Sequence, residues 1–145
     1  MAESIKTRPV SRPGENMKLI EALQYRLPLA AKLSILHRAS GLIMFGLLPF
    51  VIWLFDKSVS SEISYDAYTS AFVAGIGFVP ALIVKLAVLA LIWSFLHHAF
   101  AGVRHLWMDA THSVTKEQGH SSAVVVFAAS LVLTALLGAK LFGLF

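Results

Sequence analysis

The sequence contains no cysteine among its 145 residues. This absence excludes disulfide bonds, thiolate-ligated iron–sulfur clusters and cysteine-type zinc sites within the chain, so any metal must be bound by histidine or carboxylate. Charged residues are also scarce: they make up 14% of the sequence, against 57% hydrophobic residues, and the mean hydropathy is +0.75. A chain of this size is then too apolar for a soluble domain. The composition predicts a small all-α membrane protein.

Three apolar runs account for most of the hydrophobic residues and cover residues 33–55, 78–103 and 122–144. Each approaches or exceeds the roughly 20 apolar residues that a helix needs to cross a bilayer. The runs predict a three-helix transmembrane domain over residues 32–145, preceded by a polar segment over residues 1–31.

Two shorter helices are predicted outside these runs. Residues 16–26 are expected to form a surface helix that ends before Pro28. The connection over residues 56–77 carries Tyr65, Tyr68 and Phe72 at helical spacing, which predicts a short interfacial helix.

The basic residues indicate how the chain is oriented. Seven Lys and Arg residues lie in the part of the chain that ends at Arg38, whereas the first connection has only Lys57 and the second has Arg104 and Lys116. Because basic residues favour the cytoplasmic side, the N-terminus and the second connection are expected there. The start of the first span and the end of the second then share one membrane depth. We expect a lipid bilayer around the chain and no nucleic-acid partner.

Seven polar or ionisable residues lie within or at the ends of these two spans: Ser34, His37, Arg38, His97, His98, Arg104 and His105. A charged side chain at the centre of a membrane helix costs roughly 2.5–3.5 kcal/mol on insertion scales, so such residues usually face a cofactor, a substrate or water. Their convergence at one depth indicates a bound, anionic cofactor. The alternative is that the histidines only bridge helices through hydrogen bonds.

Helical spacing divides these residues into faces. One face of the first span carries Ser34, His37, Arg38 and Gly41, and one face of the second carries His98, Gly102, His105 and Asp109. His97 lies about 100° away from His98 and is aligned with Arg104. Of the two adjacent histidines, His98 is therefore the better candidate for a ligand.

Two strings on these faces carry a resemblance to a known family. Residues 34–41, SILHRASG, resemble the S-x-x-H-R-x-S-G signature of the cytochrome b subunits of succinate dehydrogenase (complex II). Residues 98–109, HAFAGVRHLWMD, resemble the H-x3-G-x-R-H-x-x-x-D signature of the same subunits. The two motifs occur in the family's order and on the corresponding helices, and the resemblance covers the chain from about residue 12.

The resemblance implies a role for each matching residue. His98 corresponds to the axial ligand of one haem b, which a second membrane anchor subunit shares by providing the other histidine. His37, Arg104 and His105 correspond to residues near the haem propionates. Ser34 and Arg38 correspond to residues of the ubiquinone site. Asp109 is expected to be structural and to close the end of the second helix by pairing with a nearby base.

The resemblance also implies the assembly. The three helices would form half of a haem-binding anchor bundle, with a second membrane anchor subunit, an iron–sulfur subunit and a flavoprotein subunit as partners in a bacterial inner (plasma) membrane. The chain lacks cysteines and a dinucleotide-binding glycine motif, so succinate oxidation is expected on the other subunits. The anchor of a quinol-oxidising fumarate reductase and a non-redox membrane scaffold remain as alternatives.

Overall fold

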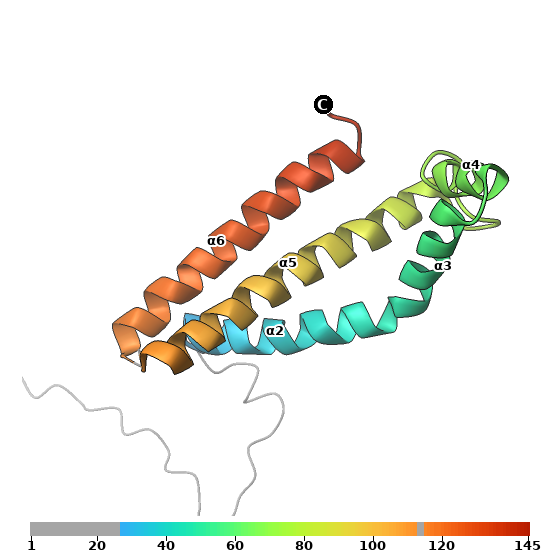
Figure 1. Ribbon diagram of the computed structural model, residues 1–145. Coiled ribbons are helices and arrows are strands. Elements are labelled where there is room, and N and C mark those ends of the chain that lie inside the picture. The colour runs from blue at the N-terminus through green and yellow to red at the C-terminus, as the bar shows by residue number, and fades with distance from the viewer. Residues whose placement is uncertain (1–26, 113–114) are drawn as a thin grey trace, which may run out of the picture.

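The computed structural model describes residues 27–112 and 115–145, which form helices joined by short turns (Figure 1). The helices are α2 (Leu29–Gly46), α3 (Leu48–Val59), α4 (Glu62–Ala71), α5 (Ala81–Thr111) and α6 (Lys116–Leu141). The predicted all-α fold class is confirmed. The surface helix expected over residues 16–26 lies outside the described residues, as does most of the polar segment 1–31.

The first apolar run is bent, although the sequence predicted one helix over residues 33–55. Helices α2 and α3 meet at Leu47 with an angle of 51° between them. Pro49 lies in the first turn of α3. Proline has no backbone N–H, and its ring clashes with the carbonyl four residues earlier, so a straight helix cannot continue through this position.

The connection between the first two apolar runs contains α4, which confirms the short helix predicted there. Its aromatic side chains contact one another along one side: the ring centroids of Tyr65 and Tyr68 are 5.7 Å apart, and those of Tyr68 and Phe72 are 5.4 Å apart. The tight turn that follows requires a glycine. Gly75 has a φ of 97°, and a Cβ there would collide with the carbonyl oxygen of Val79.

Helices α5 and α6 extend beyond their apolar runs. The sequence placed the second helix at 78–103, but α5 begins after Pro80 and continues to Thr111, where His112 ends it with a left-handed φ of 53°. Helix α6 begins at Lys116 instead of residue 122, because Thr115 and Gln118 form a reciprocal capping box. Apolar runs mark the part of a helix that fits hydrocarbon, whereas caps determine where the helix ends.

Three helices pack together at one end of the molecule. Helix α5 lies between α2 and α6, and the first half of α2, the second half of α5 and the first half of α6 gather at that end (Figure 1). Their common core consists of Leu33, Ala101, Ala123 and Val126. The two alanines let the helix backbones approach closely. Helices α3 and α4 lie at the opposite end (Figure 1).

By length and composition, α5 and α6 can each cross a membrane, and α2 with α3 makes a third span if the bent pair is counted as one. Large apolar side chains remain exposed on these helices; Phe45 of α2 is 75% exposed and Phe95 of α5 is 64% exposed. Apolar surface of this extent marks contact with lipid or with another protein.

Candidate functional site

The two motif segments face each other across the contact between α2 and α5. The rings of His37 and His98 stack, with centroids 4.1 Å apart and planes inclined by 29°. His105 lies two turns after His98 on α5. Its ring centroid is 5.5 Å from that of His37. The structure therefore brings together the three histidines that helical spacing placed on facing surfaces.

The hydrogen bonds of His98 determine which ring nitrogen carries its proton. Nδ1 lies 3.1 Å from the main-chain carbonyl oxygen of His37. A carbonyl oxygen can only accept, so Nδ1 carries a proton, and in the neutral form of the ring Nε2 then presents a lone pair. Within the described residues Nε2 of His98 has no hydrogen-bond partner. This is the arrangement that a histidine needs in order to bind a metal through Nε2.

Close backbone contact places this ring against α2. A Cβ on Gly41 would lie 3.2 Å from Cε1 of His98, which is tighter than an ordinary van der Waals contact. The glycine of the first motif thus leaves room for the histidine of the second.

His97 points to a different part of the molecule, as its spacing predicted. Its side chain is fully buried, and Nδ1 lies 3.4 Å from the hydroxyl of Ser130 on α6. The ring stacks on Trp93 at 5.3 Å and contacts Phe127 at 5.5 Å. This histidine packs between helices, so it serves the helix-bridging role that a membrane histidine commonly has.

Arg104 lies on the same side of α5 as His97 and is directed toward α6. Its Nε donates to the hydroxyl of Ser122 at 2.9 Å, and one of its terminal nitrogens donates to the carbonyl of Gly119 at 3.2 Å. Only 7% of the residue is exposed. The structure does not bring Arg104 together with the three histidines.

Ser34 and Arg38 lie one turn apart on α2, and Arg38 is exposed. Neither side chain forms a hydrogen bond or ion pair with another described residue. Nε2 of His37, between them in the sequence, is buried and also lacks a partner within the described residues. Nε2 of His97 and the hydroxyl of Ser94 are buried and unpaired in the same way. Buried polar atoms are usually paired in a complete protein, so Nε2 of His37 is available to a ligand, but it is not distinguished from the other two by this property alone.

The described histidines and carboxylates do not form a cluster that could enclose a metal ion. The ring of His37 stacks on that of His98 and is tilted by 43° to that of His105. Asp109, expected to pair with a base, forms no ion pair within the described residues, and its main-chain carbonyl accepts a hydrogen bond from Nδ1 of His112 at 2.8 Å. A metal at His98 would therefore need its other ligands from outside the described residues.

Sequence reasoning missed two serines that contact the adjacent histidines. Ser40 and Ser130 are fully buried; Ser40 lies 3.2 Å from Nδ1 of His98, and Ser130 is the partner of His97. Ser40 belongs to the first motif, which was a signal that it could be involved. Its contact with His98 depends on how α2 and α5 are aligned, which the motif does not state.

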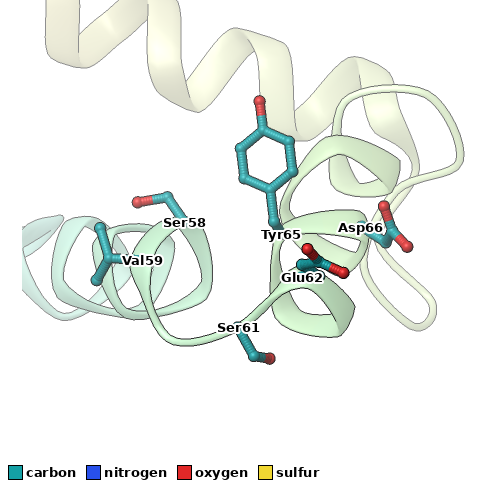
Figure 2. Close-up of a pocket in the computed structure, with 6 residues that line it drawn as sticks. All are labelled: Ser58, Val59, Ser61, Glu62, Tyr65 and Asp66. Atoms are coloured by element: carbon teal, nitrogen blue, oxygen red, sulfur yellow. The ribbon is translucent and has the colours of Figure 1, made fainter.

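A hollow of about 480 Å³ lies at the opposite end of the molecule, between α3 and α4. Its lining residues are Ser58, Val59, Ser61, Glu62, Tyr65 and Asp66. Their side chains point in different directions and do not converge on one place (Figure 2). This hollow has no catalytic constellation, and the histidine end of the bundle remains the candidate site.

Known proteins resemble the chain along most of its length. It is 31% identical over 119 residues to the succinate dehydrogenase cytochrome b556 subunit of Coxiella burnetii. These matched residues make up 82% of this chain and 90% of that protein. It is 30% identical over 112 residues to the protein of the same description from Paracoccus denitrificans, covering 77% and 81% of the two chains. The model of the succinate dehydrogenase/fumarate reductase transmembrane subunit family matches residues 13–137, and the chain therefore belongs to this family.

Proposed function

We propose that the chain is the membrane-anchoring cytochrome b subunit of a succinate dehydrogenase. In this role it binds one haem b together with a second membrane anchor subunit and forms part of the ubiquinone-reduction site, linking the tricarboxylic acid cycle to the respiratory chain. Family membership and relatives named cytochrome b556 subunits support this proposal.

The observation that carries the haem assignment is the hydrogen bond from Nδ1 of His98 to the carbonyl of His37. It leaves the Nε2 lone pair available, as an axial ligand requires. A bound haem b would supply one-electron redox chemistry at this depth. Because His98 provides one axial ligand only, the second histidine belongs to the partner anchor subunit.

The proposed propionate contacts are His37, Arg104 and His105. The unpaired, buried Nε2 of His37 supports its assignment, since a carboxylate is a suitable acceptor for its proton. His105 lies beside His37 and can share this role. The contact of Arg104 stays a prediction, and it would require the guanidinium to present N–H groups that its two bonds to α6 leave free.

Ser34 and Arg38 are proposed to bind ubiquinone. A hydroxyl and a guanidinium one helical turn apart can both donate hydrogen bonds to the carbonyl oxygens of a quinone. The lack of partners among the described residues leaves both side chains available for this purpose. The positive charge of Arg38 would favour the increase in negative charge as the quinone takes up electrons.

Electrons must reach this site from outside the chain, because it has no cysteine to bind an iron–sulfur cluster. We therefore propose an iron–sulfur subunit and a flavoprotein subunit as partners on the cytoplasmic side of a bacterial inner membrane. The exposed apolar surface of α2 and α5, including Phe45 and Phe95, would be covered by the second anchor subunit and by lipid.

A reduced-minus-oxidised optical spectrum of the purified complex tests the proposal. The bands of a low-spin b-type haem, together with succinate-dependent quinone reduction, are the expected result. Preferential quinol oxidation with fumarate would favour a fumarate reductase anchor. A complex without haem would support a scaffold in which the histidines only join helices.

A further inference from the structure

A buried serine without an assigned function lies against the proposed haem ligand. The hydroxyl of Ser40 is 3.2 Å from Nδ1 of His98, and no part of Ser40 is exposed. The same hydroxyl donates its proton to the carbonyl of His37 at 2.7 Å. One carbonyl oxygen therefore accepts hydrogen bonds from both Ser40 and His98.

This geometry determines what Ser40 can do for His98. Because its only hydroxyl proton is directed at the His37 carbonyl, the oxygen of Ser40 presents lone pairs to the Nδ1–H of His98. That N–H then has two acceptors, a carbonyl and a hydroxyl. Water has no direct access to this hydroxyl, because Ser40 is fully buried.

Gly41, the residue after Ser40, also restricts the position of the His98 ring. The backbone of Gly41 approaches Cε1 of His98 so closely that a Cβ there would lie 3.2 Å away. Ser40 and Gly41 together thus form the part of α2 against which the ring of His98 packs.

We propose that Ser40 is a positioning residue that holds the ring of His98 and adjusts the midpoint potential of the haem. The inference rests on the proposed function, in which His98 is an axial ligand. An acceptor at Nδ1–H increases the basicity of the ligating nitrogen, which stabilises the oxidised iron. Removing the Ser40 hydroxyl should therefore make the midpoint potential more positive.

The chain offers a matched control for this effect. Ser130 is also fully buried, contacts Nδ1 of the adjacent His97 and donates to the carbonyl three residues before it. Ser40→Ala and Ser130→Ala are introduced into the complete complex. Haem content, the low-spin electron paramagnetic resonance signal and the midpoint potential are then measured for each.

The expected result is a more positive potential and an altered low-spin signal in Ser40→Ala, with both unchanged in Ser130→Ala. An unchanged potential in Ser40→Ala, or equal shifts in both variants, would overturn the inference. If Ser40→Ala assembles without haem, Ser40→Thr, which restores a hydroxyl, is the second variant. Recovery of the low-spin haem in Ser40→Thr supports positioning by the hydroxyl. Failure to recover the haem contradicts this role. Absence of haem from the unaltered complex would instead overturn the proposed function.

Discussion

His37 contacts His98 in two independent ways: its ring stacks on the ring of His98 at 4.1 Å, and its main-chain carbonyl accepts the Nδ1–H of His98 at 3.1 Å. The carbonyl contact requires a particular alignment of α2 against α5 but does not require the His37 side chain. The orientation of His98 and the contacts of the His37 ring can therefore be separated by mutation.

The first prediction uses this separation. His37→Ala should keep the low-spin haem signal, because the carbonyl that orients His98 is retained, while the haem potential shifts through loss of a propionate contact. Redox titration of the haem band in the purified complex measures both properties. A complete loss of low-spin haem at normal subunit content would show that the side chain, and not the carbonyl, maintains the ligand.

The second prediction concerns the adjacent histidines. His98→Ala should remove or convert the low-spin haem signal, since the nitrogen that is proposed to bind the iron is lost. His97→Ala should retain the signal but destabilise the complex by about 1–3 kcal/mol, because a fully buried ring packed on Trp93 and Phe127 is lost. Optical spectra and thermal unfolding of both variants provide the test. Loss of the signal in the His97 variant alone would reverse the ligand assignment.

The third prediction concerns quinone. Ser34→Ala and Arg38→Leu each remove a proposed donor, and a hydrogen bond to a charged group contributes about 1.5–3 kcal/mol, so quinone reduction should fall roughly ten- to hundredfold. Succinate oxidation with an artificial acceptor that takes electrons upstream should persist. Lys32→Leu, an exposed cation on the same helix, is the matched control and should leave both activities near normal. Equal loss of both activities in assembled Ser34 or Arg38 variants would indicate a role in assembly.

The fourth prediction concerns Arg104. Arg104→Met should destabilise the complex by about 1.5–3 kcal/mol, because the hydrogen bonds to Ser122 and to the Gly119 carbonyl are lost in a buried setting. Ser122→Ala, which removes one acceptor, should have a smaller effect on the melting temperature. A more negative haem potential in Arg104→Met but not in Ser122→Ala would support the proposed propionate contact. An unchanged melting temperature in Arg104→Met would contradict its role in joining α5 to α6.

Much of the site could be predicted because helical phase alone places residues on faces. The separation of His98 from His97, and the grouping of His37 with His98 and His105, follow from spacing on two helices. The direction of Arg104 could not be assigned in this way. Its side of α5 was known, but α6 and its Ser122 had no known position.

The ends and bends of the helices show a similar limit. Pro49 breaks the first helix from within an apolar run, so the hydrophobic pattern gives no sign of the bend. The capping box of Thr115 and Gln118 lies in the polar connection before the third apolar run, so the start of that run does not mark the start of the helix. Ser40 is a different case, because its role depends on the alignment of two helices far apart in the chain. Local patterns do not determine such an alignment.

The final prediction tests the orientation on which electron delivery depends. The excess of basic residues before and within the start of α2 predicts that the end carrying His37, His98 and Arg38 faces the cytoplasm, beside the soluble electron donor. Ala67 on α4 and Ala110 near the end of α5 are both exposed alanines, on the two opposite ends of the bundle. Because the chain has no cysteine, Ala67→Cys and Ala110→Cys each create a single thiol. An impermeant thiol reagent added to intact cells should label Ala67→Cys, whereas Ala110→Cys should react only after the membrane is permeabilised. The opposite pattern would place the proposed quinone site on the far side of the membrane from its electron source and would contradict the proposed function.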